Sequence, residues 1–255
     1  MQNASGEPTN PCVHARAGWR SIRRGPICRG AIVGALTCVL GLSLFGGVAE
    51  GASTHRASEL ARARKSLLVL KDMPKGWTSS KAENNNSPTP DAAQLAACLG
   101  VPLSIVNDNP PTVYSPNFKS KHDLQTVDDS IELFPSARAA RVDLSTASSP
   151  KAPACLTTNF NTPAARSQLK HAFGSGASIG TAVVTRTPVS DYAPHTVNIT
   201  IFIPITAHDV TINLETTELG FVQGDEEQVM VLNSVQTPFP TALSRRLTAL
   251  AHKRL

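Results

Sequence analysis

The stretch 197-VNITIFIPI-205 decides the fold, because each of its odd positions carries valine or isoleucine. Alternation with a period of two is typical of a strand that buries one face. Pro204 lacks the amide proton that a neighbouring strand needs, so this end of the strand is expected to lie at a sheet edge or a bulge. The buried face could form the floor of a ligand-binding cleft or could be plain core packing. The residues concerned are Ile199, Ile201 and Ile203.

This strand, at 196–206, has neighbours of the same character at residues 179–187, 209–222 and 227–236. In 209–222 the apolar positions run through Leu214 and then slip to Leu219 and Phe221, which predicts a β-bulge near Thr217–Glu218. Short turns separate the last three strands. Connections this short join antiparallel neighbours, so the C-terminal third is predicted to form a four-strand antiparallel meander.

The rest of the chain is predicted to form helices and one more strand. Leucines at three- and four-residue steps indicate the first helix, and proline next to threonine or serine marks where later helices begin. The helices span residues 56–71, 89–100, 137–147, 163–173 and 240–255, and the strand spans 124–134. The polar segment 79–90 and the proline-rich segment 101–118 are expected to be irregular. This order predicts an α+β fold, an antiparallel sheet of about five or six strands with helices packed on it.

A corner follows the first helix at 70-LKDMPKGWTSS-80, where Pro74 and Gly76 end it. Trp77 comes directly after this corner. A lone aromatic side chain is usually a packing residue. Trp77 is therefore expected to fill an edge of the core, and stacking on a ligand is the alternative.

Residues 1–52 have the composition of an export leader. Five arginines precede the uncharged run 31-AIVGALTCVLGLSLFGGVA-49, and small residues follow it. These features are typical of a cleaved signal peptide, but the run is also long enough for an uncleaved membrane anchor. Cys38 does not lie in a convincing lipobox, and Arg23-Arg24 does not begin a twin-arginine signal. In either case residues 53–255 are predicted to be exported as a single domain.

The exported domain is close to neutral. The leader holds five of the 24 basic and two of the 19 acidic residues, which leaves a net charge of +2 for residues 53–255. No basic patch interleaved with aromatic residues remains. The composition therefore argues against nucleic-acid binding.

Two of the five cysteines, Cys98 and Cys155, lie outside the leader. An even pair in an exported domain predicts one disulfide, because an oxidising compartment lets the pair close. Two unpaired buried thiols are the alternative. Neither cysteine has a histidine close by, and the chain has no HExxH and no histidine pair with i,i+4 spacing, so the sequence predicts no metal site.

One catalytic pattern occurs, 176-GASIG-180, which matches G-x-S-x-G with Ser178 at its centre. A nucleophile elbow needs a strand before the serine and a helix after it, whereas a helix is expected before Ser178 and a strand after it. The motif therefore indicates a connector. A serine hydrolase is a remote alternative that needs His171 or His195 within hydrogen-bond reach of Ser178.

The acidic pairs Asp128-Asp129 and 225-DEE-227 could serve a glycosidase only if their carboxyls came within about 5–10 Å of one another. We expect them instead to be charged strand edges and turn tips, and His208-Asp209 to be a solvated hairpin tip. No other constellation for catalysis or for a cofactor is visible in the sequence. The chain is therefore predicted not to be an enzyme and to hold no cofactor.

The resemblance of the chain to known proteins rests on the helix that leads into 72-DMPKGWT-78 and on the segments 97-ACLG-100, 130-SIELFPSARAA-140 and 154-ACL-156. In these segments the chain resembles a group of secreted actinobacterial proteins. These are similar in pattern to LpqN-type lipoproteins and to the extracellular sensor domains of mycobacterial receptor serine/threonine kinases. The resemblance covers residues 60–250 and implies a PsbP-like α+β fold, with a central ligand cleft in the sensor domains. The chain departs from this pattern in having no lipobox cysteine, no kinase domain and a single cysteine pair.

These observations predict a non-enzymatic, exported cell-envelope protein, secreted or anchored to the outer face of the cytoplasmic membrane through residues 31–49. It is expected to be a sensor-like or ligand-binding module for an unknown small or apolar ligand. The alternative is an envelope interaction or scaffold protein that binds another protein and no small ligand.

Overall fold

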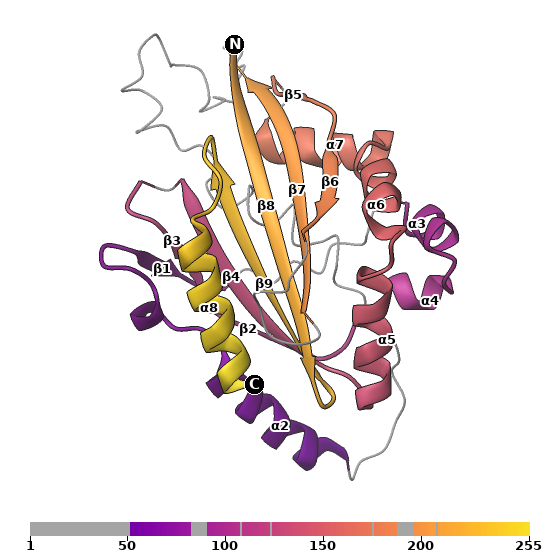
Figure 1. The fold of residues 1–255 in the computed structure, drawn as a ribbon, viewed down its shortest axis with the longest axis vertical. Helices are drawn as coiled ribbons and strands as arrows, with labels where there is room; N and C mark the ends of the chain where they lie inside the picture. Colours follow the sequence, from indigo (N-terminus) through magenta and orange to yellow (C-terminus); the bar gives the residue numbers. More distant parts are fainter. Residues whose placement is uncertain are drawn as a thin grey trace, which may run out of the picture.

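A single antiparallel sheet forms the centre of the protein (Figure 1). The computed structural model describes residues 52–82, 91–107, 109–122, 124–174, 176–187, 196–207 and 209–255. Within these residues the 9-stranded sheet has the order β1-β3-β4-β9-β8-β7-β5, with β2 paired to β4 and β6 paired to β7. The predicted α+β class is confirmed, and the sheet has more strands than the sequence predicts.

The strands are β1 Thr78–Ser80, β2 Thr112–Tyr114, β3 Asn117–Lys119, β4 Gln125–Leu133, β5 Ser178–Ile179, β6 Val183–Arg186, β7 Thr196–Ala207, β8 Val210–Gln223 and β9 Glu226–Val235. The helices are α2 Ala52–Ser66, α3 Ala92–Leu99, α4 Leu103–Val106, α5 Ala137–Ala147, α6 Ala152–Phe160, α7 Pro163–Phe173 and α8 Thr241–Arg254, with a 3-10 turn η2 Leu70–Asp72. The long strands β7, β8 and β9 follow one another as the predicted antiparallel meander. The segment 179–187 divides into the two short strands β5 and β6, which both pair with β7.

Helices cover both faces of the sheet. The α5 face carries the odd-numbered residues of β7 and β9 and the even-numbered residues of β4 and β8, and α3, α5, α6 and α7 pack on it. The α8 face carries the other residues of these strands, and α2 and α8 pack on it. In Figure 1, α8 lies to the left of the long strands β7 and β8, and α5, α6 and α7 lie to their right.

Local signals set the boundaries of several helices as predicted. Ser136 caps α5 by accepting a hydrogen bond from the Ala139 amide (3.2 Å), and Thr162 caps α7 by accepting one from the Ala165 amide (3.3 Å). Gly100 follows α3 with a φ of +75°, a left-handed conformation that glycine adopts without strain. These helices begin or end where their own residues satisfy the terminal backbone groups.

The first helix ends earlier than predicted. α2 stops at Ser66 rather than at residue 71, although the leucine pattern continues. The amides of Leu68 and Val69 donate hydrogen bonds to the carboxyls of Asp129 and Asp72, each at 2.8 Å. Side-chain acceptors thus replace the helical carbonyls, and one of them is 61 residues away in the sequence.

Trp77 packs against the core, as the sequence predicts. Its half-buried side chain lies against an apolar cluster on the α8 face. That cluster includes Phe118, Phe221 and Leu247, which come from β3, β8 and α8. The corner after α2 therefore brings the indole to the edge of this core.

The segments expected to be irregular contain short elements. Residues 101–118 hold α4, β2 and most of β3, and β1 begins at Thr78. α6 was also not expected. Strands of three residues are too short to show a periodic pattern, and β2 and β3 form because β4 offers both of them a partner. Residues 83–90 of the polar loop lie outside the described residues.

The predicted bulge in β8 is wrong. β8 pairs residue for residue with both β7 and β9. The apolar pattern slips because both faces of the strand are covered by helices. Leu214 packs on the α5 face, whereas Leu219 and Phe221 pack on the α8 face.

The alternating isoleucines of β7 are core residues. Ile199, Ile201 and Ile203 are 1%, 0% and 0% exposed and pack with side chains from α3, α6 and α7. Ile201 and Ile203 are thus core residues, whereas Ile199 also lines a small cavity beneath α5. Pro204 lies between the residues that pair with β5 and those that pair with β6, and its carbonyl accepts a hydrogen bond from the Gly180 amide (2.7 Å). The nitrogen of Pro204, which carries no proton, therefore faces away from β8, on the side of β7 that is expected for a sheet edge.

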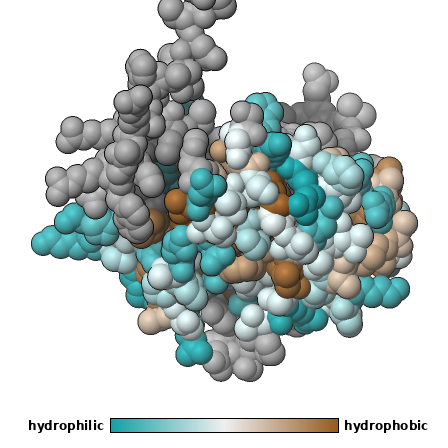
Figure 2. Space-filling view, turned by 90° about the horizontal axis from the view of Figure 1, so that it is seen from above, coloured by the Kyte–Doolittle hydropathy of each residue, from teal (hydrophilic) through white to brown (hydrophobic). Residues whose placement is uncertain are grey.

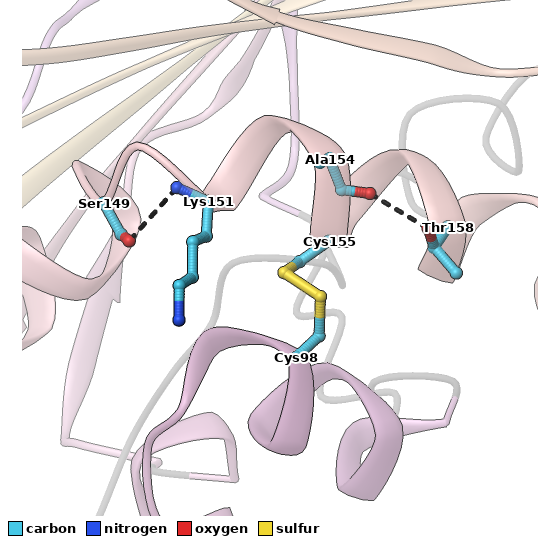
Figure 3. Close-up of a disulfide and its surroundings, with 6 residues drawn as sticks. All are labelled: Cys98, Ser149, Lys151, Ala154, Cys155 and Thr158. Carbon is cyan, nitrogen blue, oxygen red and sulfur yellow. Dashed lines mark hydrogen bonds between the residues drawn. A yellow bond between two sulfur atoms is a disulfide. The ribbon is translucent and has the colours of Figure 1, made fainter.

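A disulfide joins two helices of the α5 face (Figure 3). Cys98 of α3 and Cys155 of α6 are bonded, with their Cα atoms 5.7 Å apart and a sequence separation of 57 residues. This is the pairing that the sequence predicts, and it removes the alternative of two free thiols. In the chain-entropy account a cross-link over a loop of this length raises the free energy of unfolding by roughly 4 kcal/mol.

Candidate functional site

Buried carboxyl groups gather on the α5 face beneath helix α5. Glu132 of β4 and Glu227 of β9 lie opposite each other in the sheet, and Glu218 lies on the adjacent strand β8. Asp143 of α5 shares a hydrogen bond with Glu227, which requires one of these two carboxyls to be protonated. These acids are 7%, 4%, 3% and 6% exposed, in the order Glu132, Glu227, Glu218 and Asp143.

A small cavity lies between α5 and the sheet at this point. Its volume is ≈ 20 Å³, which is room for about one water molecule. A Cβ atom placed on Gly220 would lie 3.4 Å from both Glu227 Oε1 and Leu144 Cδ1, so glycine at this position helps to keep the cavity open. The acids that line the cavity are Glu218, Glu227 and Asp143, and its apolar walls are Leu144, Ala147, Val197, Ile199 and Val229.

Glu218 is the most isolated acid of this site. Neither of its carboxyl oxygens has a hydrogen-bond partner among the described residues. Burial raises the pKa of Glu218 to about 8, because a desolvated carboxylate without a partner is strongly disfavoured. At pH 7 the group is therefore held as a neutral acid, which can donate a hydrogen bond into the cavity.

Glu227 is perturbed in the same direction. Burial raises the pKa of Glu227 well above its usual value, the nearby charge of Glu132 raises it further, and the hydrogen bond with Asp143 opposes both. Its Oε2 atom has no hydrogen-bond partner among the described residues. The cavity is thus bordered by acidic groups with unused hydrogen-bonding capacity.

The α8 face also buries acids, but arginine accompanies them there. Asp72 accepts two hydrogen bonds from the Arg254 guanidinium, at 2.7 and 2.8 Å. Burial acts to raise the pKa of Asp72, but the hydrogen bonds from Arg254 and from the Val69 amide outweigh it and hold the pKa below its usual value. Arg246 donates to the Asp72 carbonyl at 2.7 Å. This network ties the turn η2 to helix α8.

Two further acids of the α8 face have partners. Asp129 accepts hydrogen bonds from the Leu68 amide and from the Gln228 side-chain amide. Burial raises the pKa of Asp129 to about 7 in spite of these bonds. Glu226 accepts a hydrogen bond at 2.6 Å from Arg62 of α2. Asp129 and Glu226 are therefore anchoring residues for α2 and the segment that follows it.

The expectation that the acidic pairs are charged strand edges and turn tips holds for Asp225, which lies in the turn between β8 and β9, and is wrong for three other acids. Asp129, Glu226 and Glu227 are buried, and neighbouring acids point to opposite faces of the sheet. Asp128 lies on the α5 face, next to Asp129 on the α8 face. A glycosidase pair could not be formed by side chains that a sheet separates in this way.

Sequence reasoning missed Glu218 as a candidate site residue. The only signal was the disturbed apolar pattern around Thr217–Glu218, which we interpreted as a bulge. A buried acid inside an otherwise regular strand produces the same disturbance.

Ser178 lies in the two-residue strand β5, with its side chain exposed. Helix α7 precedes it, the reverse of the strand-then-helix order of a nucleophile elbow. His171, on α7, makes no hydrogen bond to Ser178 in the described structure. His195 and His208 lie outside the described residues. That the chain is not an enzyme stays a prediction.

Within the described ranges, no group of three or more histidine, cysteine, aspartate or glutamate residues is arranged to hold a metal ion. In the same part of the chain no helix combines the length and apolar character needed to cross a membrane. The predicted leader, including residues 31–49, lies outside the described residues.

Comparison with known proteins identifies no family. No family model and no curated protein matches the chain. Among solved structures it is similar to the extracellular domain of PknH from Mycobacterium tuberculosis, with 12% identity over 76% of this chain and 95% of that chain and a TM-score of 0.34. A TM-score this low carries no argument about function. The proposals below rest on the residues of the chain itself.

Proposed function

We propose that the protein is a non-enzymatic, exported cell-envelope module that binds a small ligand in the cavity beneath α5, in the manner of a sensor domain. The observation that carries this proposal is Glu218, a carboxyl 3% exposed with both oxygens unbonded at the wall of a cavity. Export is supported by the Cys98–Cys155 disulfide, because such bonds persist in oxidising compartments outside the cytosol.

A buried acid without a partner costs free energy, and a fold without a use for it is expected to replace it with an apolar residue. Strongly perturbed acids in cavities are candidates for function for this reason. A ligand that bonds to Glu218 removes the cost. The bound and free states then differ in the packing between α5 and the sheet, which is a physical basis for sensing.

Native mass spectrometry tests this proposal. The full chain, produced in an export-competent bacterial host, is compared under native and denaturing conditions with its Glu218→Gln and Ser178→Ala variants. We expect a mass excess on the wild type that disappears on denaturation, is lost in Glu218→Gln and is retained in Ser178→Ala. A bare mass for all three proteins would overturn ligand binding at this site.

A second candidate function is an envelope interaction protein without a small ligand. Val183 of β6 and Phe202 of β7 are paired across the sheet and are 47% and 38% exposed. An exposed apolar pair next to a short edge strand is a possible contact for another protein. On the side of the molecule seen in Figure 2, hydrophobic residues lie in small separate areas among hydrophilic ones. The same spectra distinguish the two candidates, because this one predicts a bare mass together with assemblies.

A further inference from the structure

We propose that the cavity beneath α5 takes a small cationic group, the –NH3+ of ammonium or of a primary amine, held between the carboxylates of Glu218 and Glu227. This inference rests on the proposed function, since it names the ligand chemistry of the same site. Four features of the site carry it: its unbalanced charge, its size, its acceptor set and its apolar walls.

The first feature is a charge imbalance. Glu218 has two unbonded oxygens and Glu227 has one, and no lysine or arginine among the described residues pairs with either. The groups that face them are also acids, Asp143 from α5 and Glu132 from β4, and β7 contributes only apolar residues to the cavity. The lining that the structure describes therefore contains carboxyl groups and no lysine or arginine, so ionisation of Glu218 would leave a negative charge without a counter-charge in the wall. A cation from outside would complete the site.

The second feature is size. The cavity of ≈ 20 Å³ admits a group about as large as one water molecule. An ammonium group has these dimensions. A quaternary ammonium or a guanidinium group is larger, so both are excluded without a movement of α5.

The third feature is the set of acceptors. Calcium takes about 6–8 oxygen ligands and magnesium needs near-octahedral coordination, whereas the described residues contain no group of three acids placed for a metal. An –NH3+ group needs only hydrogen-bond acceptors, and each of its three protons can donate to a carboxylate oxygen. The unbonded oxygens of Glu218 and Glu227 are acceptors of this kind once the carboxyls are ionised.

The fourth feature is the wall. Leu144, Val197, Ile199 and Val229 surround the acids with hydrocarbon. The cavity is partly open, so the carbon atoms of an alkylamine would extend along this wall toward the opening while the –NH3+ group fills the cavity. The wall also strengthens the attraction between the ammonium and carboxylate groups by excluding water. The site therefore resembles an apolar pocket with an acidic end.

Binding must be coupled to proton release. Glu218 is a neutral acid in the empty site, and a cation is held best by its carboxylate. Glu227 and Asp143 share one proton, which stays on Asp143 while Glu227 accepts hydrogen bonds from the cation. When RNH3+ enters, the Glu218 O–H bond breaks and its proton goes to the solvent. The site gains one positive charge with the cation and loses one with the proton, so its net charge does not change. Burial raises the pKa of Glu218 to about 8, so the release is close to one proton at pH 7 and small above pH 9.

Isothermal titration calorimetry on the full chain tests the inference. Ammonium chloride and ethylamine hydrochloride are the probes, and tetramethylammonium chloride at equal ionic strength is the control. Repeating each titration at pH 7 in two buffers with different ionisation enthalpies gives the number of protons released. We expect both probes to bind with release of about one proton, and tetramethylammonium not to bind.

Three variants locate the binding. Glu218→Gln is expected to weaken the affinity by about tenfold or more, because a charge-assisted hydrogen bond is lost, and to abolish proton release. Gly220→Ala is expected to abolish binding by placing a methyl group in the cavity. Glu215→Gln makes the same chemical change on the opposite face of β8, and it should bind as the wild type does.

The outcomes distinguish the free ammonium ion from a primary amine. They also distinguish failure of this inference from failure of the proposed function. Binding of ammonium without ethylamine identifies the free ion, and binding of both identifies a primary amine. Equal binding of tetramethylammonium, or unchanged binding in Glu218→Gln, overturns the inference. If neither probe binds while the native mass excess is lost in Glu218→Gln, the ligand is not an amine and the proposed function stands. If neither probe binds and the native mass is bare, both proposals fail.

Discussion

The two faces of one sheet differ in the partners that they give to buried acids. On the α8 face Asp72 is bonded to Arg254 and Glu226 is bonded to Arg62. On the α5 face Glu218 has no bonded oxygen among the described residues. The difference does not follow from the strands, because β8 and β9 contribute to both faces. It follows from the helices, since α2 and α8 bring arginines to the sheet and α5 brings Asp143 to the cavity.

This comparison distinguishes acids that anchor elements of the fold from acids that are available to a ligand. An acid whose partner comes from the chain itself holds two elements together. Its hydrogen bonds are present whether or not a ligand is bound. An acid whose hydrogen-bonding capacity is unused is available to a ligand. Glu226 and Glu227 are neighbours in the sequence but point to opposite faces. Glu226 is bonded to Arg62, whereas Glu227 is bonded to Asp143 and keeps one unbonded oxygen among the described residues.

The helices that cover each face of the sheet can be destabilised separately. Loss of the disulfide is expected to have the largest effect on the free energy of unfolding. The double variant Cys98→Ala/Cys155→Ala frees α3 from α6 and should lower the free energy of unfolding by roughly 4 kcal/mol. Urea denaturation of the full chain measures it. Treatment of the wild type with a reductant should give a loss of similar size. A loss below about 1 kcal/mol in both experiments would show that this layer holds without its cross-link.

The layer on the other face depends on Arg254. Arg254→Met leaves Asp72 buried without its counter-charge and should lower the free energy of unfolding at pH 7 by about 3 kcal/mol. The pKa of Asp72 is lowered in the folded protein. The stability that the pair supplies is thus present at neutral pH and lost as the pH falls through the folded-state pKa, so the variant should lose less stability on acidification than the wild type.

The neighbouring variant Lys253→Met is the control for Arg254. Lys253 is exposed, so its replacement should change stability by less than about 0.5 kcal/mol. Equal losses in the two variants would mean that the last turn of α8, rather than the ion pair with Asp72, is responsible.

Glu218→Gln is expected to raise the free energy of unfolding, whereas Arg254→Met lowers it. Since the folded-state pKa of Glu218 is raised to about 8, the wild type loses stability as the pH rises from about 4.5 to 8, where the unfolded chain releases a proton that the folded chain keeps. Glutamine cannot titrate. In amine-free buffer the variant should match the wild type near pH 5 within about 1 kcal/mol and exceed it by about 3 kcal/mol at pH 8.

Glu226→Gln is the matched change on the α8 face. It removes the charge that Arg62 neutralises, so it should lower the stability at pH 8, by only about 1 kcal/mol because Arg62 is largely exposed. If Glu218→Gln and Glu226→Gln changed the stability in the same direction, the contrast between the faces would be lost.

The smallest effect is expected at the edge of the sheet, outside both buried layers. Ser178→Ala removes an exposed hydroxyl, so the free energy of unfolding should change by less than about 0.5 kcal/mol. Any hydrolysis of nitrophenyl esters by the preparation should be unchanged. A complete loss of such activity in this variant would revive the serine-hydrolase alternative.

Much of the fold could be predicted because its signals are local. The alternation in 197–205 indicates β7, Ser136 and Thr162 indicate where α5 and α7 begin, and the cysteine count indicates the disulfide. What could not be predicted depends on residues far apart in the chain. β2 and β3 need β4 as a partner, and α2 ends where Asp129 takes the amide proton of Leu68.

The candidate site belongs to this second group. Glu218 disturbs an apolar pattern, and from the sequence a buried acid cannot be distinguished from a bulge. Its neighbours Glu227 and Asp143 come from another strand and from a helix that precedes both strands in the chain. Only the packing of α5 on the sheet brings the three together around one cavity.

By itself, the sequence determined the α+β class, the cysteine pair, the order of the long elements and the expectation of export, because periodicity, capping residues and composition act over a few neighbouring residues. The tertiary structure alone decided which buried acids have an arginine and which do not. The reason is that burial and charge pairing depend on the side chains that come to lie on each face of the sheet, and helices from distant parts of the chain supply these side chains.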